Sequence, residues 1–168
     1  MAEVGILKPE DRVELINGEI YQISPIGSRH AGIVNKLSKI FNDLFKDQAI
    51  VAVQNPIRVD ANNELEPDIA LLKFKPDYYA SDHPAPSEVL ALIEVAGASI
   101  RFDREVKKAL YAACAIRLYW IINIENNQIE AYSTPTDDKY STFHLYKKDD
   151  NIPLLDKRLN VNELILLS

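Results

Sequence analysis

The sequence of 168 residues contains a single cysteine, no long apolar run and no excess of basic residues. The lone cysteine, Cys114, cannot form a disulfide within the chain, which fits a reducing compartment, and we expect it to be a small core residue. The apolar runs are too short to cross a bilayer. Residues Met1 to Gly5 lack the basic and apolar regions of a secretion signal. These absences predict a cytoplasmic protein that does not associate with membranes.

The charge balance excludes one class of nucleic-acid binder. The formal net charge is −6, whereas a protein that coats nucleic acid needs a basic surface. A nuclease is not excluded, because part of its acidic charge would belong to a metal site. Such an enzyme would need a local basic patch, and the best candidate is the cluster of Arg101, Arg104, Lys107 and Lys108.

The organisation of the chain predicts one domain that spans residues 1–168. No repeat, low-complexity tract or linker interrupts the sequence, and its length allows a full core. Near the N-terminus, Asn17-Gly18 separates two strand-like runs. This dipeptide is the strongest short hairpin signal, because both turn residues need a positive φ. Pairing Ile16 with Glu19 would place Glu14 opposite Tyr21 and put both acids on one face of the hairpin.

The rest of the chain predicts helices and strands in mixed order. The spacing of apolar residues predicts a helix at about 29–46, and Asp103 is suited to cap a second helix that runs to about Ala115. Continuous apolar runs predict strands that are covered on both faces, at 69–73, 89–95 and 118–124. The other predicted elements are a strand at 50–59 with Pro56 at an edge or bulge, a turn at 60–64, a loop at 76–88, a hairpin of 128–133 with 140–146, and a packed tail at 154–167 with a short helix at about 162–166. Together they make an α/β or α+β domain around one buried mixed sheet.

Two acidic residues stand in apolar strand runs. Asp68 opens the run that follows Pro67, and Glu94 interrupts the run from Val89 to Ala96. Burying an ionisable group in such a strand costs free energy, so these carboxylates are strong functional candidates. On the helix that follows, at about 100° per residue, Lys107 falls on the inward arc with Val106, Leu110, Tyr111 and Cys114, whereas Lys108 falls outside it. A lysine on a buried stripe needs an anionic partner or a function.

These groups can build a metal-dependent hydrolase. Mg²⁺ and Mn²⁺ prefer oxygen ligands, and one or two carboxylates usually bind them together with water and phosphate. Asp68 and Glu94 would supply the carboxylates, and the carbonyl group of Val95 a further oxygen. The metal would polarise the scissile phosphate and lower the pKa of a bound water, and Lys107 would orient that water and offset charge in the transition state. The chemistry alone also allows a structural interpretation, in which Asp68 starts a strand, Glu94 ends one and Lys107 extends to solvent.

A series of short motifs resembles the PD-(D/E)XK nuclease superfamily, and more closely a bacterial family of restriction-endonuclease-like proteins. In chain order the motifs are Glu14-Leu15-Ile16-Asn17-Gly18-Glu19, Ser24-Pro25 with His30, the run from Gln54 to Arg58, Pro67-Asp68, Ile93-Glu94-Val95, the run from Asp103 to Lys107, and Tyr119-Trp120-Ile121-Ile122. The resemblance covers about residues 12–146. It implies a restriction-endonuclease-like fold, with a mixed central sheet flanked by helices and an N-terminal hairpin.

The resemblance also implies an endonuclease that acts on DNA with Mg²⁺ or Mn²⁺ and has Asp68, Glu94 and Lys107 as catalytic residues. The superfamily places its lysine two positions after the glutamate, where this chain has Ala96. In the closer family the lysine lies on the next helix, as Lys107 does. That family has a polar stretch after Glu-Val, where this chain has Gly97-Ala98-Ser99. A non-catalytic nucleic-acid- or protein-binding module on the same fold, acting as a homodimer, is therefore the second hypothesis.

Four further residues are candidates for supporting roles. His30 lies on the apolar stripe of the first predicted helix, as a satisfied buried histidine or as one that supports the metal or contacts phosphate. Glu19 reaches the metal site from the hairpin or is a surface acid. Gln54 contacts the site from its strand or is a polar edge residue, and Asp103 opens the Asp-Arg-x-x-Lys motif.

Overall fold

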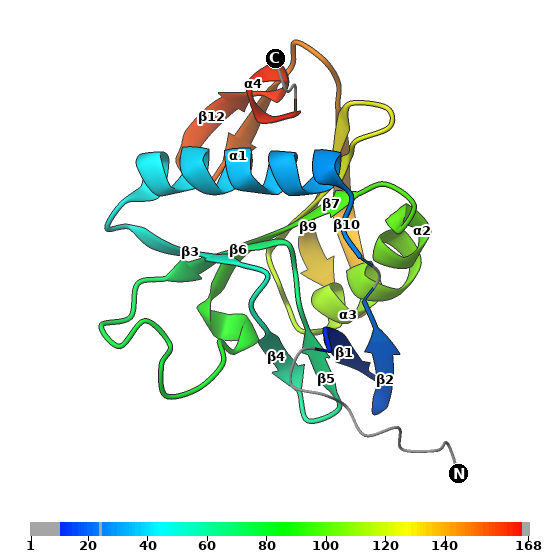
Figure 1. Ribbon diagram of the computed structural model, residues 1–168. Coiled ribbons are helices and arrows are strands. Elements are labelled where there is room, and N and C mark those ends of the chain that lie inside the picture. Colours follow the sequence, from blue (N-terminus) through cyan, green and yellow to red (C-terminus); the bar gives the residue numbers. More distant parts are fainter. Residues whose placement is uncertain (1–10, 24, 166–168) are drawn as a thin grey trace.

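A mixed six-stranded sheet forms the centre of the computed structural model, which describes residues 11–23 and 25–165 (Figure 1). The order of its strands is β10-β9-β8-β7-β6-β3. Their bounds are Ala49–Val53 (β3), Ile69–Lys73 (β6), Val89–Ala96 (β7), Leu118–Asn123 (β8), Gln128–Thr136 (β9) and Lys139–Tyr146 (β10). β7 and β8 are parallel and the other neighbours are antiparallel. The predicted mixed sheet is confirmed.

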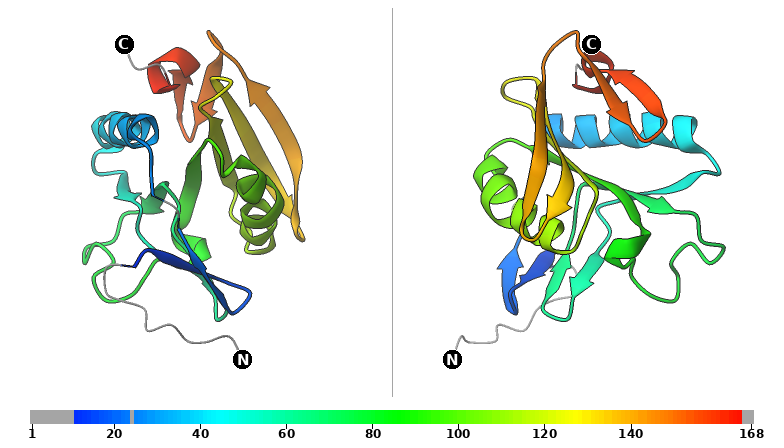
Figure 2. Two further views of the ribbon diagram at one scale, coloured as in Figure 1. Left: turned by 45° about the vertical axis from the view of Figure 1, so that its right-hand side comes forward. Right: turned by 180° about the vertical axis from the view of Figure 1, so that it is seen from behind.

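Apolar cores lie on both faces of this sheet. In β6, Ile69 and Leu71 belong to one core and Ala70 and Leu72 to the other, because successive side chains of a strand point to opposite faces. Helix α1 (Ser28–Phe45) covers the first face, and the opposite face is covered by a helical segment and a smaller sheet (Figure 2). The continuous apolar runs are thus strands buried on both sides, as predicted.

The C-terminal tail completes the core against which α1 packs. It consists of a hairpin of β11 (Asn151–Leu154) and β12 (Lys157–Asn160), followed by α4 (Val161–Ile165). Ile152, Leu154 and Leu164 are fully buried in the same core as α1. Packing of the tail and its short helix was predicted from the sequence, but the β11–β12 hairpin was not.

The smaller sheet has the order β2-β1-β5-β4 in the described part of the chain. Its strands are Val13–Ile16 (β1), Glu19–Gln22 (β2), Ile57–Asp60 (β4) and Asn63–Leu65 (β5). The predicted hairpin register is confirmed, with Glu14 opposite Tyr21 and Ile16 opposite Glu19. Asn17 and Gly18 have φ angles of 52° and 78°, the positive values that this tight turn demands.

The predicted single strand at 50–59 is wrong. β3 ends at Val53, and β4 begins at Ile57 in the other sheet. The backbone leaves β3 at Gln54, which has a φ of 51° and donates its N–H to the carbonyl group of Asp68 at 3.1 Å. Pro56 follows, and its lack of an N–H prevents continuation of the ladder. This turn brings the Gln54 side chain to the start of β6. The predicted loop at 76–88 is present and contains only the short 3-10 turn η1 (Pro86–Glu88).

The second predicted helix starts earlier than expected. It runs from α2 (Ile100–Phe102) through a π-helical turn, η2 (Asp103–Lys107), into α3 (Lys108–Ala113). Asp103 therefore does not cap the helix; it lies inside it, is buried, and accepts a hydrogen bond from the Ser99 hydroxyl at 3.1 Å. Ala115, at a φ of 58°, ends the segment.

Some predicted features lie outside the described residues: Met1 to Gly5, Ser24 of the Ser24-Pro25 motif, and Leu166 at the end of the predicted C-terminal helix. None of the helices in the described part of the chain is long and apolar enough to cross a membrane.

Candidate active site

A cavity of about 550 Å³ opens where β6 and β7 meet α1, the segment from α2 to α3 and the β1–β2 hairpin. Its polar lining comes from six separate segments of the chain. The ionisable and amide side chains that line it are Arg12, Glu14, Gln22, Arg29, His30, Gln54, Glu66, Asp68, Glu94, Asp103 and Lys107. Six of the seven residues predicted to be catalytic or supporting are among them, and Val95 also lines the cavity.

Asp68 stands immediately before β6, and three groups hold its carboxylate. His30 Nε2 lies 3.0 Å from Oδ2, the Val95 N–H donates to Oδ2 at 2.8 Å, and Gln54 Nε2 donates to Oδ1 at 3.2 Å. Burial would raise the pKa of Asp68, but the hydrogen bonds, led by the one from His30, lower it below its ordinary value. Asp68 is therefore a fixed, ionised carboxylate at neutral pH.

Glu94 is buried within β7 and faces Asp68 across the strand pair. Its Oε2 accepts the Asp68 N–H at 3.3 Å, while its Oε1 accepts from Lys107 Nζ at 3.0 Å and from the Tyr111 hydroxyl at 3.2 Å. Burial raises the pKa of Glu94 well above its ordinary value, and Lys107 opposes that rise. The ends of β6 and β7 thus bond reciprocally: Asp68 binds the backbone after Glu94, and Glu94 binds the backbone of Asp68.

Lys107 points into the cavity, as its place on the inward arc predicted, and it is only 6% exposed. Its ammonium lies 2.8 Å from Glu14 Oε1 and 3.0 Å from Glu94 Oε1. Burial alone would lower the pKa of Lys107, but the carboxylates of Glu94 and Glu14 raise it above its ordinary value. Lys108, in contrast, lies outside the cavity with its ammonium 4.9 Å from the centre of the Tyr132 ring.

Two groups of this cluster were not predicted. Glu14 is 5% exposed and binds both Lys107 and the Glu66 N–H, the latter at 2.9 Å. Tyr111 is fully buried and donates to Glu94. The hairpin register indicated the face of Glu14, but which acid of that face meets Lys107 depends on how the small sheet docks against the helical segment.

Asp103 adds a further carboxylate to the cavity. Burial raises its pKa to about 6, against the opposing effects of Lys107 and the Ser99 hydroxyl. The cavity is lined by the carboxylates of Glu14, Glu66, Asp68, Glu94 and Asp103, against the cations of Arg12, Arg29 and Lys107. Negative charge is therefore in excess. Burial is the main reason why the pKa values of Glu94 and Asp103 are raised, and the neighbouring carboxylates add to the rise.

Glu19 does not line the cavity, so of its two predicted alternatives the surface acid is the one that the structure shows. Its side chain is exposed at the tip of the hairpin, and its carboxylate accepts the Tyr21 hydroxyl at 3.2 Å. The face that Glu14 and Glu19 share is correct, but only the Glu14 end of the hairpin lies over the helical segment. The Glu19 carboxylate thus orients Tyr21.

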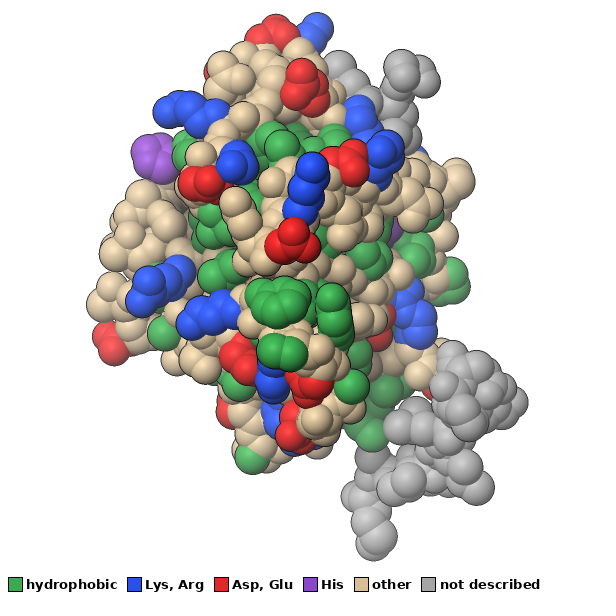
Figure 3. All heavy atoms as spheres, turned by 90° about the vertical axis from the view of Figure 1, so that its left-hand side faces the viewer, with side chains coloured by type: hydrophobic (Ala, Val, Ile, Leu, Met, Phe, Trp, Pro, Cys, Tyr) green, Lys and Arg blue, Asp and Glu red, His purple; other side chains and the backbone are tan. Residues whose placement is uncertain are grey.

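The expected basic patch of Arg101, Arg104, Lys107 and Lys108 is also absent. Lys107 is buried between carboxylates, Arg104 pairs with Glu130, and Arg101 lies 3.9 Å from Glu105. The sequence places these cations close together, but the helix distributes them around its axis. Figure 3 shows the side of the molecule that is opposite to this helical segment, where basic and acidic side chains are also interspersed.

The donor set of the cavity fits a hard divalent cation. Asp68 Oδ1 and Glu94 Oε2 each accept one hydrogen bond, and a carboxylate oxygen has two lone pairs. The excess of carboxylates would also be offset by a cation. The described residues contain no group of three or more His, Cys, Asp or Glu side chains arranged to hold a metal. A cation here would therefore be held by two carboxylates, with backbone carbonyl or water completing its shell, as Mg²⁺ often is.

Comparison with known proteins adds a family and a fold. The family model Uma2, described as "Putative restriction endonuclease", matches residues 2–160, whereas no curated protein matches the sequence. Among solved structures, the chain is similar to one described as "a putative nuclease belonging to DUF820 from Anabaena variabilis ATCC 29413". The TM-score is 0.73 at 16% identity, over 95% of this chain and 93% of that one. At this identity the likeness shows the fold alone, and that fold agrees with the predicted one.

Proposed function

The chain belongs to the Uma2 family, and on that premise we propose that it is an endonuclease that hydrolyses phosphodiester bonds of DNA with the help of Mg²⁺ or Mn²⁺. The observation that carries this proposal is the reciprocal bonding of Asp68 and Glu94, which directs two carboxylates from adjacent strands into one cavity. Two carboxylates beside a buried lysine are the groups that such a hydrolysis needs.

The chain's own residues would divide the work. Asp68 and Glu94 would hold the metal, with the carbonyl group of Val95 as a further oxygen donor. When bound, the metal would polarise the scissile phosphate and lower the pKa of an attacking water. His30 and Gln54 fix the Asp68 carboxylate from two sides, so its position is set before substrate arrives. Such preorganisation reduces the rearrangement that the reaction requires.

Lys107 would stabilise the charge that develops on the phosphate. An ammonium has three donors, and two of those of Lys107 are directed at Glu14 and Glu94. The third would remain for a phosphate oxygen or the attacking water. The two carboxylates also hold Lys107 protonated, because they raise its pKa.

Cleavage of plasmid and oligonucleotide DNA, with Mg²⁺ or Mn²⁺ and with a chelator, tests the proposal. We expect metal-dependent cleavage by the wild type and its loss in Asp68→Asn and Glu94→Gln. Glu130→Gln is the matched control, since Glu130 is also a buried carboxylate in an ion pair but does not line the cavity. If the wild type cleaved none of a broad panel of DNA substrates, the proposal that this protein is an endonuclease would be refuted.

A second candidate function is a non-catalytic binding module on this fold. It is favoured by Ala96, which stands where the superfamily has its lysine and is fully buried. It is also favoured by Gly97 and Ala98, which give the cavity an apolar rim in place of the family's polar stretch. Metal or DNA binding without cleavage would support this function. Homodimerisation, which remains a prediction, is tested by the mass in solution.

A further inference from the structure

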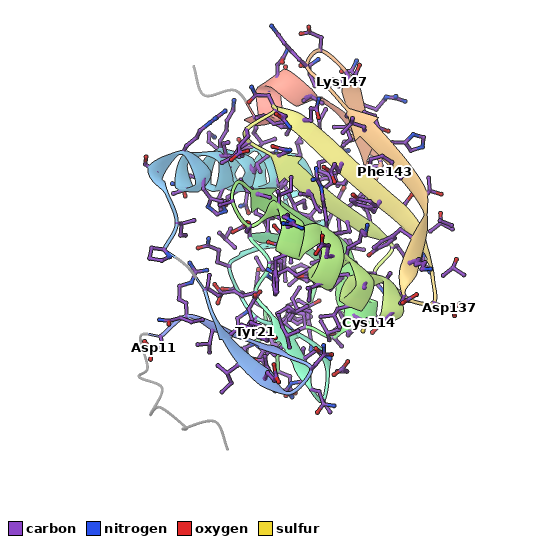
Figure 4. The ribbon with its side chains drawn as sticks, turned by 90° about the vertical axis from the view of Figure 1, so that its right-hand side faces the viewer. Asp11, Tyr21, Cys114, Asp137, Phe143 and Lys147 are labelled. Carbon is purple, nitrogen blue, oxygen red and sulfur yellow. The ribbon has the colours of Figure 1, made fainter. Side chains whose placement is uncertain are left out.

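One part of the cavity lining is apolar and includes two aromatic rings. The apolar side chains are those of Tyr21, Ile23, Ile26, Phe102 and Ile124, in addition to Pro25 and Ala98. Tyr21 is 41% exposed, and its ring centroid lies 6.0 Å from that of Phe102. Figure 4 shows Tyr21 on the hairpin below the helical segment. The Tyr21 ring therefore lies partly exposed at the opening of an acidic cavity, although its burial would lower the free energy of the fold.

The aromatic surface is continuous with the proposed catalytic groups. Tyr21 is the cross-strand partner of Glu14, and Glu14 holds the Lys107 ammonium. The Tyr21 hydroxyl is fixed by Glu19 at 3.2 Å, which limits rotation of the ring. A planar group stacked on Tyr21 and Phe102 would thus lie beside the place where a phosphate would meet Lys107.

The cavity has few cations for the phosphates of a duplex. Arg12, Arg29 and Lys107 are the Arg and Lys side chains that line it within the described chain. Arg12 pairs with Glu66, and Lys107 with Glu14 and Glu94. Arg29 donates to the neutral Asn127 side chain at 3.0 Å, and no carboxylate among residues 11–23 and 25–165 pairs with it. Proteins that grip duplex DNA commonly make about six to ten phosphate contacts, which this lining does not supply.

We propose that this cavity takes an unstacked nucleotide of single-stranded DNA, with its base on Tyr21 and Phe102 and its phosphate at Arg29 and Lys107, in preference to intact duplex. This inference rests on the proposed endonuclease and names its substrate. Aromatic stacking is the usual means by which proteins bind single strands. The volume of about 550 Å³ lies in the range of sites for small organic molecules.

Binding of fluorescein-labelled oligodeoxythymidine and of the matching duplex, followed by fluorescence anisotropy, tests the proposal. The measurements use an Asp68→Asn background, which removes a proposed metal ligand so that bound DNA stays intact. We expect the single strand to bind more tightly than the duplex, with a shallow salt dependence of about one or two phosphate contacts. Tyr21→Ala should weaken single-strand binding about tenfold, and Tyr21→Phe should retain it.

Ile20→Ala is the matched control, because Ile20 is the adjacent residue, is 56% exposed and points to the other face of the hairpin. Equal binding of duplex and single strand, or equal effects of Tyr21→Ala and Ile20→Ala, would overturn the inference. If Tyr21→Ala left the cleavage of duplex DNA unchanged, the inference would also be overturned, whereas the proposed endonuclease activity would stand. Conversely, if the wild-type protein bound single strands selectively but cleaved no DNA, this binding site would be supported and the proposed endonuclease activity would be refuted.

Discussion

Two adjacent lysines, Lys107 and Lys108, show how much a single helix position decides. Lys107 lies between two buried carboxylates, whereas the ammonium of Lys108 lies over the Tyr132 ring outside the cavity. The inward position of Lys107 was predicted from helix geometry and is confirmed. Its catalytic role remains a proposal.

We predict that Lys107→Ala lowers the rate of metal-dependent DNA cleavage by about a hundredfold or more, the range for the loss of one transition-state donor. Lys108→Ala should change the rate less than about threefold. Because Lys107→Ala leaves two buried carboxylates without their cation, its melting is recorded in parallel and the rates are compared where both variants are folded. Equal cleavage rates for the two variants would show that Lys107 does not take part in the reaction.

Asp103 gives a prediction on pH and stability. Burial raises its pKa from an ordinary 3.8 to about 6, so the folded protein binds a proton more tightly than the unfolded chain does. The protonated form stabilises the fold below pH 3.8, and this contribution is lost as the pH rises through about 6. Asp103→Asn, which cannot ionise, should therefore be more stable than the wild type at pH 7.5 without divalent metal. The expected gain is on the order of 2 kcal/mol.

Urea unfolding of both proteins in a chelator measures this gain across the pH range. The difference in free energy of unfolding should stay nearly constant above about pH 6 and shrink as the pH falls from about 6 towards 3.8. A difference that does not depend on pH would show that the substitution acts through packing or through the bond from Ser99, and not through charge.

At the scale of secondary structure, the β1–β2 hairpin carries Glu14 and Tyr21 to the cavity. Its turn depends on Gly18, whose φ is 78°, a conformation that costs an L-residue about 1–2 kcal/mol. We predict that Gly18→Ala destabilises the protein by about 1 kcal/mol and reduces DNA cleavage further than this loss explains, because Glu14 shifts from Lys107. Gly27→Ala is the control for stability alone, since Gly27 has a φ of −71° and an added Cβ would meet no atom within 4 Å. Equal unfolding free energies for the two variants would contradict the prediction.

Elements set by local chemistry could be predicted from the sequence. The Asn17-Gly18 turn fixed the hairpin register, and unbroken apolar runs identified β6 and β7. Asp68, Glu94 and Lys107 could be identified as candidate site residues because each places a charge where the local pattern predicts an apolar side chain. Glu14 gave no such signal, since a strand of four residues alternates in any case. Its burial comes from docking of the small sheet, a contact between distant segments. The break in the strand at Gln54 was not predicted for the same reason. It depends on the hydrogen bond from the Gln54 N–H to the carbonyl group of Asp68.

At the scale of the molecule, the candidate site lies where the two sheets, α1 and the helical segment meet. Glu14 comes from the small sheet, Asp68 and Glu94 from the central sheet, His30 from α1 and Lys107 from the helical segment. The elements that bury the two cores are thus held together at one end by ionised groups. A cation that relieves repulsion among these carboxylates would strengthen contacts between both sheets, α1 and the helical segment. Occupancy of this cavity should therefore affect global unfolding as well as local order.

We accordingly predict that millimolar Mg²⁺ or Mn²⁺ raises the melting temperature of the wild type. A ligand that binds only the native state stabilises it by about 2.7 kcal/mol at a hundredfold excess over its dissociation constant, which for a domain of this size is a shift of about 5 °C or more. Asp68→Ala should abolish the rise, whereas Asp43→Asn should preserve it, because Asp43 pairs with Lys39 on the exposed side of α1. Differential scanning fluorimetry over a metal titration measures the shift. A melting temperature that stays constant over the titration, or a rise that survives Asp68→Ala, would mean that the two carboxylates do not hold a cation and that the lysine neutralises them alone.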